Sequence, residues 1–332
     1  MQNGKITIDD IARELNISKT TVSRAISGKG RISRETTERV RQFISEHNYH
    51  PSAIAKGLAQ SKTYNIAFAM PGESKFVDLP FFQKCMWGIT ACAAEHDYDV
   101  LLCMLDENDT SGLERLVINH KVDGVILGRT YENALSEKYL TQQGIPFVTI
   151  GTSSLAGTVQ IDNDHTAACR ELTSVLLNAG YRRLGVIGGR TEHIVNKNRL
   201  TGFKEAFAGT GISPDENLII TGSSDPEFVE PALDKLIDRH AECIVCTDDS
   251  VCSIVLNRLS ALGYLVPANM RVASFYSSSV LEKSKPSITS LEFDAVQAGR
   301  MGCERLLDLI AGEAVEEMTL LGYTIRMGES TK

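Results

Sequence analysis

The sequence predicts two unlike parts, an all-α helix-turn-helix head and a larger α/β body built on parallel sheets. Apolar residues at helical spacing fill the first fifty positions, and apolar runs alternate with amphipathic segments over the rest. Charge divides at the same place. Residues 1–62 hold eleven Lys/Arg and six Asp/Glu, a balance of +5, which leaves 23 and 36, or −13, for the other 270 residues. A basic module on an acidic body favours phosphate binding at one end only.

The bulk composition, 42% hydrophobic and 23% charged over 332 residues, is that of a globular protein with a sizeable core. No apolar run approaches the roughly 18 residues needed to span a bilayer, and the first ten residues lack the apolar stretch of a secretory signal. The eight cysteines are spread through apolar surroundings. We therefore expect reduced, buried thiols in a cytoplasmic protein without membrane association.

Three short helices are expected in the head, near residues 8–15, over Ser18–Ile26 and from about Ser33 to His47. Thr7 can cap the first helix, in a capping box with the residue three positions on, and Ser18 can cap the second. A tight turn between the first two helices is typical of a helix-turn-helix.

The second helix should have one polar and one apolar side. At 100° per residue, the polar side is Lys19, Thr20, Ser23 and Arg24, and the apolar side is Val22, Ala25 and Ile26. Such a polar side suits the major groove of DNA, where arginine can bond a guanine bidentately. An ordinary solvated helix face would give the same amphipathic pattern.

Residues 6–59 resemble the DNA-binding head of the lactose/galactose repressor family. The matching runs are D-I-A at 10–12, T-V-S-R at 21–24, I-S-x-E-T at 32–36 and N-Y-x-P at 48–51. The resemblance implies that Lys19, Thr20 and Arg24 read bases. It also implies further contacts, mainly to the DNA backbone, from Thr7, Ser18, Thr21, Ser23 and Asn48.

Ser52–Gln60 is a nine-residue helix candidate with Gly57 near its middle. It is shorter than the roughly 12–15 residues of a marginally stable isolated helix, so we expect it to fold only on a partner. The resemblance implies a hinge helix in the DNA minor groove, with Leu58 as the wedge between base pairs and Ala55 and Ala59 beside it.

The body alternates expected strands with helices, which predicts parallel sheets covered on both faces and ligands at the carboxyl ends of the strands. The expected strands are Ile66–Met70, Val100–Met104, Gly124–Leu127, Phe147–Ile150, Leu184–Ile187, Leu218–Ile220, Cys243–Cys246, Val272–Phe275 and Thr319–Arg326. The expected helices are Phe82–Glu95, Thr166–Ala179, Arg199–Ala208, Pro231–Arg239 and Val251–Leu262.

The body resembles the sensor of the same family. The marks include D-G-V-I at 123–126, D-N at 162–163, R-L-x-G-F at 199–203, T-D-D at 247–249 and I-T-S-L at 288–291. This implies a periplasmic-binding-protein-like sensor of two doubly wound parallel-sheet subdomains. The expected divisions are a head over 1–50, a hinge over 51–62 and a sensor over 63–327, whose first subdomain is 63–161 plus 292–322 and whose second is 162–291.

The resemblance also implies an effector site between the subdomains. Its expected residues are Phe81, Phe82, Arg129, Thr130, Arg199, Asp248 and Tyr276. Arg199, expected at the start of a helix, would bind sugar hydroxyls or an anion, although a surface arginine is the alternative. Tyr276 stands where many sugar-binding relatives carry an acidic residue. The nearest pattern is that of the maltose-type regulators, which points to an α-glucoside or malto-oligosaccharide.

Other chemistry is weakly supported. Gly185-x-x-Gly188-Gly189 matches no phosphate-loop motif and is better explained as a turn. Cys243 and Cys246 lie three apart in a strand, on opposite faces, so core cysteines are favoured over a redox or metal pair. The Asp248-Asp249 pair has no clustered histidines beside it. We expect no catalytic site, no metal and no cofactor, hence not an enzyme.

The sequence as a whole predicts a homodimeric repressor whose protomers each read half of a pseudo-palindromic operator, under control of a small-molecule effector, a sugar. The absence of an added leucine heptad favours a dimer. The rival interpretation is a sugar-binding or carbohydrate-processing protein with an incidental basic N-terminus.

Overall fold

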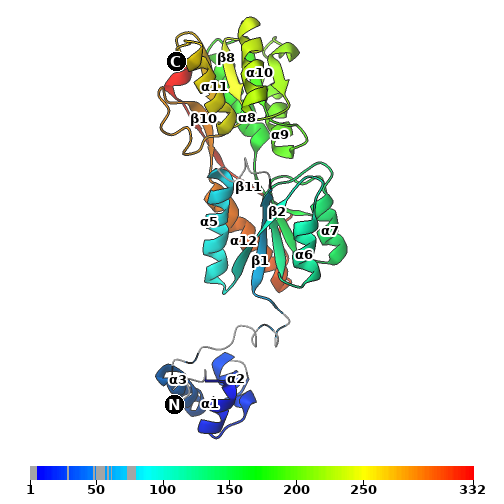
Figure 1. Cartoon of the computed structure of the whole chain (residues 1–332), viewed down its shortest axis with the longest axis vertical. Coiled ribbons are helices and arrows are strands. Elements are labelled where there is room, and N and C mark those ends of the chain that lie inside the picture. Colours follow the sequence, from blue (N-terminus) through cyan, green and yellow to red (C-terminus); the bar gives the residue numbers. More distant parts are fainter. Residues whose placement is uncertain are drawn as a thin grey trace. The chain divides into compact units, whose positions relative to one another are not determined.

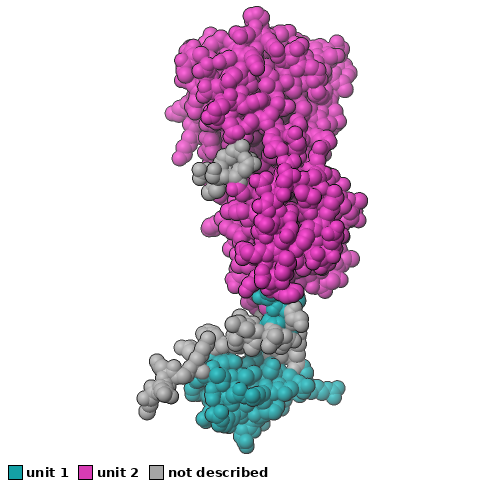
Figure 2. All heavy atoms as spheres, turned by 45° about the vertical axis from the view of Figure 1, so that its right-hand side comes forward, with its two compact units in different colours: residues 1–63 teal, residues 64–332 magenta. Residues whose placement is uncertain are grey.

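The chain divides into two compact units, residues 1–63 and 64–332 (Figure 2). The computed structural model describes residues 6–27, 30–47, 49, 57, 60, 62–72 and 80–332. The expected hinge, apart from single positions in it, lies outside these residues.

The first unit contains the three expected helices, α1 (Ile8–Glu14), α2 (Lys19–Ser27) and α3 (Arg34–Glu46) (Figure 1). The two predicted caps are confirmed, since Thr7 and Asp10 form a capping box at α1 and Ser18 Oγ accepts from the Thr21 amide at 3.1 Å. Ser33, expected to begin the third helix, is instead the residue that caps α3. The core is built on side chains that have no exposed surface, namely Ile11, Val22 and Val40.

The second unit holds two six-stranded sheets. In the first the strand order is β11-β5-β4-β3-β1-β2, and in the second it is β12-β10-β9-β8-β6-β7. All neighbouring strands pair in parallel except β12, which is antiparallel to β10. The first sheet consists of β1 (Asn65–Pro71), β2 (Asp99–Leu105), β3 (Gly124–Leu127), β4 (Phe147–Ile150), β5 (Val159–Asn163) and β11 (Met318–Leu321). The second consists of β6 (Leu184–Gly188), β7 (Ile219–Thr221), β8 (Cys243–Cys246), β9 (Arg271–Ser274), β10 (Thr289–Phe293) and β12 (Tyr323–Arg326).

Helices cover both faces of each sheet, as the near-continuous apolar strands predict (Figure 1). The first sheet has α5 (Pro80–Glu95) and α12 (Ala295–Ala311) on one face and α6 (Ser111–Ile118) and α7 (Leu135–Gln143) on the other. The second has α8 (His165–Asn178) and α9 (Ile194–Glu205) on one face and α10 (Pro226–Asp238) and α11 (Asp249–Ala261) on the other. Two short 3₁₀ turns, Glu216–Leu218 and Glu329–Thr331, complete the described elements of this unit.

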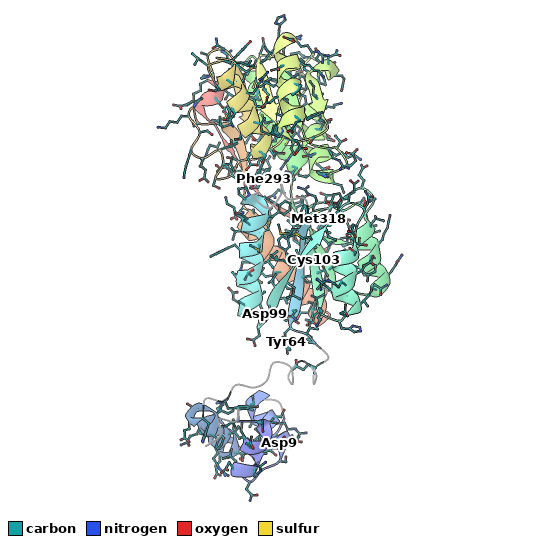
Figure 3. All side chains as sticks on the ribbon, in the orientation of Figure 1. Asp9, Tyr64, Asp99, Cys103, Phe293 and Met318 are labelled. Carbon is teal, nitrogen blue, oxygen red and sulfur yellow. The ribbon has the colours of Figure 1, made fainter. Side chains whose placement is uncertain are left out.

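Within residues 80–332 the chain passes between the sheets after Asn163, after Phe293 and at Gly322. Phe293, the last residue of β10, lies where the chain returns to the first sheet (Figure 3). The expected single strand Thr319–Arg326 is wrong, because Gly322 divides it into β11 and β12, which pair in different sheets. The expected strand Leu218–Ile220 begins one residue late, since Leu218 closes a 3₁₀ turn.

Three helices of this unit were not foreseen in the sequence, namely α6, α7 and α12, and neither were the strands β5 and β10. Among the described residues, no helix combines the length and the apolar character needed to cross a bilayer.

Candidate functional site

The polar side of α2 is exposed on the surface of the first unit. Val22 and Ala25 are buried, whereas Lys19, Thr20, Ser23 and Arg24 are exposed. The side predicted from helical geometry is therefore the one that faces solvent. Arg24 passes close to Gly30, where a β-carbon would lie 3.2 Å from Arg24 Cδ.

Several of the other side chains predicted to contact DNA already form hydrogen bonds or ion pairs within this unit. Thr7 caps α1, and the hydroxyls of Ser18 and Thr21 are 2.8 Å apart at the start of α2. Lys19 forms an ion pair with Asp9 of α1, and both side chains are about half exposed or more. An exposed pair of this kind exchanges at little cost, so Lys19 remains available to a phosphate or a base. The predicted contacts Asn48, Ala55 and Leu58 lie outside the described residues.

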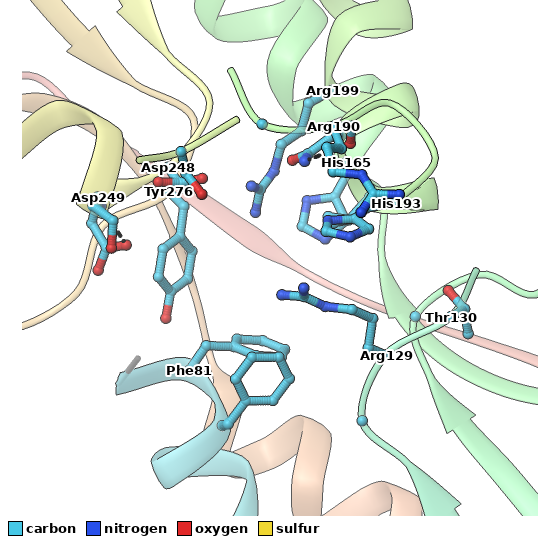
Figure 4. Close-up of a pocket in the computed structure, with 18 of the residues that line it drawn as sticks. Phe81, Arg129, Thr130, His165, Arg190, His193, Arg199, Asp248, Asp249 and Tyr276 are labelled. Atoms are coloured by element: carbon cyan, nitrogen blue, oxygen red, sulfur yellow. Dashed lines mark hydrogen bonds between the residues drawn. The ribbon is translucent and has the colours of Figure 1, made fainter. Parts of the chain in front are cut away.

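A cavity of about 290 Å³ lies between the two sheets of the second unit. Its walls come from the carboxyl ends of parallel strands in both sheets, as Arg129 follows β3, Asp162 lies in β5, Asp248 follows β8 and Tyr276 follows β9. Figure 4 shows Arg199 and Arg129 extending into this space, with Tyr276 and Phe81 beside it. Strand ends that converge from two sheets are where ligands bind in folds of this class.

The structure brings all the predicted effector residues together. Each of the seven lines this cavity, namely Phe81, Phe82, Arg129, Thr130, Arg199, Asp248 and Tyr276. Their role in ligand binding stays a prediction. One detail is wrong: Arg199 does not begin a helix but lies in the second turn of α9, which starts at Ile194.

Arg199 is held in place by its neighbours. Only 7% of its surface is exposed, its Nη1 donates to the carbonyl oxygen of Thr247 at 2.9 Å, and its guanidinium carbon lies 5.9 Å from the ring centre of Tyr276. Tyr276 in turn stacks on Phe293 and meets the edge of Phe81 at 6.0 Å. A surface arginine is therefore excluded, and the aromatic rings give the cavity an apolar wall.

Phe81 and Phe82 differ in burial. Phe82 is 2% exposed, and the guanidinium of Arg129 lies 5.3 Å from its ring centre. Phe81 is only half-buried and lines the cavity beside Tyr276.

Two adjacent aspartates follow β8 and have different surroundings. Asp248 caps α11 by accepting from the Val251 amide at 2.9 Å, its other oxygen accepts from the Thr247 hydroxyl at 3.5 Å, and the residue lines the cavity. Asp249 is 2% exposed, and burial raises its pKa, an effect that the hydrogen bond from Ser278 offsets only in part. Asp248 was predicted at this site and Asp249 was not, although both line the cavity.

A buried pair, Asp162 and His165, lies where β5 passes into α8. His165 Nε2 is 3.4 Å from Asp162 Oδ1, and the second carboxylate oxygen accepts from the amide and hydroxyl of Thr152 at 2.8 and 2.7 Å. Burial alone would raise the pKa of Asp162, but the hydrogen bonds from His165 and Thr152 lower it below its ordinary value. This pair adds a fixed carboxylate to the cavity wall.

Charged contacts cross from the first half of the unit to the second. Glu107 and Glu132, in the loops after β2 and β3, pair with Arg190 and Lys197, each at 2.5 Å. Tyr131 and His193 form an isolated backbone bridge, and their rings meet edge on at 5.6 Å. Arg190 and His193 also line the cavity.

Several residues that line the cavity were not predicted from the sequence, most prominently His165, Arg190, His193, Asn196 and Asp249. Only the Asp162-Asn163 and Thr247–Asp249 marks pointed to their neighbourhood. The expected turn at Gly185–Gly189 is instead mostly strand, since β6 runs to Gly188. A β-carbon at Gly188 would lie 2.3 Å from the side chain of Thr247, the residue that follows β8. Cys243 and Cys246 face different cores, as predicted.

In the described ranges, no group of three or more histidine, cysteine, aspartate or glutamate side chains is placed to hold a metal.

Two family models match the chain. The model for bacterial regulatory proteins of the lacI family covers residues 7–52. The model for periplasmic binding proteins and the sugar binding domain of the LacI family covers residues 71–301.

Individual relatives agree with these matches. The HTH-type transcriptional regulator MalR of Streptococcus pneumoniae is 29% identical over 92% of this chain and 93% of its own. The transcriptional regulator CelR, solved with cellobiose, is 26% identical, with a TM-score of 0.73 over 98% and 99%. The lac repressor dimer bound to operator and an anti-inducer is 19% identical, with a TM-score of 0.82 over 99% of both chains, which confirms the predicted fold class. The matched proteins are regulators and not enzymes, and MalR agrees with the maltose-type pattern.

Proposed function

The chain belongs to the lacI family of bacterial regulatory proteins, DNA-binding transcriptional regulators with a sugar-binding domain, and from this premise we propose that it is a repressor released from its operator by a sugar. Residues 1–50 would bind DNA, residues 51–62 would form the hinge, and residues 63–327 would sense the effector and dimerise. The observation that carries the proposal is the cavity in which both sheets present polar strand ends around buried Arg199.

The DNA-binding role rests on α2 and on charge. The exposed Arg24, Thr20 and Lys19 would read bases in the major groove, and the +5 balance of residues 1–62 supplies sequence-independent attraction. The acidic second unit would be repelled from the phosphates, which confines contact to the head.

The effector we propose is a neutral sugar of the α-glucoside or malto-oligosaccharide type. Three arginines line the cavity (Arg129, Arg190, Arg199), and four aspartates do so (Asp162, Asp225, Asp248, Asp249). These charges nearly balance, so the cavity does not select strongly for an anion. Hydroxyl groups both donate and accept, and the aromatic wall suits a sugar face. Similarity to MalR, and to CelR solved with cellobiose, supports an effector built of glucose units.

We propose a homodimer in which each protomer reads half of a pseudo-palindromic operator. Edge strand β2 and nearby helices expose apolar side chains that a second copy would cover, namely Trp87 (74% exposed), Leu102 (50%), Met104 (51%) and Ile118 (66%). The cytoplasm, where operator DNA lies, is its proposed location.

The test is operator binding with and without sugar. An operator selected from a random duplex library should bind the full chain with an affinity that falls steeply with salt. Removal of residues 1–61 should abolish that binding and leave maltose binding intact. Maltose should lower operator affinity in the full chain. A chain that shows no preference among duplexes, or whose operator affinity ignores every sugar of a glucoside panel, would contradict the proposal.

A further inference from the structure

The contacts between the loops of the two sheets form a charged clasp at one side of the cavity. It consists of the pairs Glu107–Arg190 and Glu132–Lys197 together with the Tyr131/His193 bridge. Each partner of a pair comes from a different half of the unit, since Glu107 and Glu132 follow strands of the first sheet while residues 190–197 follow β6 of the second. Separation of the halves on this side must break both ion pairs.

Both sides of the clasp are held in position by their own half. The Asn133 side chain donates to the carbonyl oxygen of Glu107 at 2.9 Å, which fixes the loop after β2 to the loop after β3. On the other side the Asn196 side chain donates to the carbonyl oxygen of Arg190 at 3.0 Å. These bonds fix the backbone at Glu107 and at Arg190, so only the side chains themselves remain to be ordered when the pair forms.

Arg190 also has a second carboxylate within reach. Glu192, in its own half, lies 3.7 Å from Arg190 Nε, whereas Glu107 of the opposite half lies 2.5 Å from Nη2. When the halves separate, Arg190 can keep Glu192 as its partner. The retained partner lowers the cost of separating Arg190 from Glu107, as a reversible switch requires.

We propose that this clasp controls entry of the effector, by holding the halves together around the cavity and opening to admit and release the ligand. The proposal rests on the effector role assigned to the cavity above. Arg190 and His193 belong to the cavity wall and the clasp at once, so closure of the clasp and completion of the site are a single event. Glu107, Glu132 and Lys197 lie outside the cavity lining and act as positioning residues.

The clasp has a kinetic signature that a simple ligand contact lacks. A weaker clasp admits the ligand faster and also retains it less, so both rate constants rise and dissociation rises more. Loss of a ligand contact raises dissociation alone. Binding of an uncharged sugar should moreover depend on salt, because the partly exposed ion pairs of the clasp are screened.

The experiment measures maltose binding by stopped flow in the full chain. Glu107→Gln and Glu132→Gln should each raise the association rate and weaken binding about two- to five-fold, the effect of a partly exposed pair, and should reduce the salt dependence. Glu216→Gln is the matched control, because it breaks the exposed pair with Lys204 of α9 inside one half, at 2.8 Å, and should change nothing. Glu132→Lys should be worse than Glu132→Gln, and Glu132→Lys with Lys197→Glu should restore wild-type rates.

A second readout needs no ligand. Spin labels at exposed Asn119 of the first half and Asp238 of the second should give a narrower distance distribution in the wild type than in Glu107→Gln. The native cysteines are all buried and should not interfere. Identical distributions, or faster dissociation with unchanged association, would overturn the clasp. If no sugar binds but the distributions differ as expected, the effector assignment fails while the clasp stands.

Discussion

Replacement of Arg199 by alanine tests the sensing site most directly. Arg199 is 7% exposed, and its guanidinium donates to Thr247 O at 2.9 Å and lies over the ring of Tyr276. These contacts fix the orientation of the guanidinium and therefore of its remaining N–H groups. A hydrogen bond to a charged group contributes about 1.5–3 kcal/mol. The variant should therefore bind maltose about 10- to 150-fold more weakly, since each 1.4 kcal/mol is a factor of ten.

The same substitution also removes contacts inside the protein. Thr247 O loses a donor and Tyr276 loses a cation over its ring, which together cost about 1–3 kcal/mol of folding free energy. Sugar affinity and stability must therefore be measured separately, the first by calorimetry and the second by thermal unfolding without ligand. Arg199→Lys keeps the charge but not the planar fork and should fall between wild type and alanine in sugar affinity. Lys204→Ala, on the same helix but away from the cavity, is the control and should leave sugar affinity unchanged.

Operator binding should distinguish a sensing residue from a general structural one. Anisotropy titrations of Arg199→Ala with operator should match wild type without sugar and should fail to respond to maltose. If the variant binds maltose as tightly as wild type does, Arg199 is not a sugar contact. If a phosphorylated sugar binds the wild type well while maltose does not, Arg199 pairs with an anion and the effector is not a neutral sugar.

Three further predictions follow from other parts of the structure. Arg24→Ala should weaken cognate operator binding by about 1–3 kcal/mol and relax one base-pair preference per half-site, and equal losses on cognate and random duplexes in a gel-shift comparison would count against its role. Gly299→Ala should destabilise the second unit by about 1–3 kcal/mol or more in urea unfolding, because its β-carbon would lie 2.1 Å from Cys85 O, whereas Gly302→Ala, with 3.5 Å of room, should be neutral or stabilising. Glu107→Gln should leave operator affinity without sugar unchanged while raising the maltose concentration needed for release, as a dose–response titration would show.

The parallel sheets and the amphipathic α2 were predictable because each depends on a local sequence pattern, the apolar runs of the strands and the helical spacing of α2. The side of α2 that contains Val22 and Ala25 is buried, as angular spacing requires. By contrast α12 was missed, since Gly299 and Gly302 depress helix propensity along a segment that packing makes helical. The close approach of α12 to α5 at Gly299 is a tertiary fact, with no local signature.

The division of Thr319–Arg326 was unpredictable for a similar reason. Both segments, β11 and β12, have the apolar pattern of a strand. Gly322, which separates them, has open space where a side chain would lie, so nothing in the immediate sequence requires a break. What decides the break is that β5 and β10 belong to different sheets and each accepts one half. Strand pairing between positions so far apart is set by the whole fold.

The residues of the candidate site also differ in whether local sequence could indicate them. Arg129 and Asp248 could be named because the family resemblance implies them and because both follow strands whose ends are visible in the sequence. Arg190 could not, because its significance comes from Glu107, which lies 83 positions away and in the other half. Glu132 and Lys197 are likewise 65 positions apart.

The modest strength of the clasp is what suits it to regulation. A ligand shifts an equilibrium only by its differential affinity for the two states, and coupling between sites is typically about 1–3 kcal/mol. Two partly exposed ion pairs contribute up to about 2 kcal/mol together. A fully buried pair would hold the halves too firmly for the cavity to open and admit a sugar, and no pair at all would leave closure to the ligand alone. The half-exposed Arg190, between Glu107 and Glu192, gives a pair weak enough to open for entry of a neutral effector and strong enough to favour closure once the effector is bound.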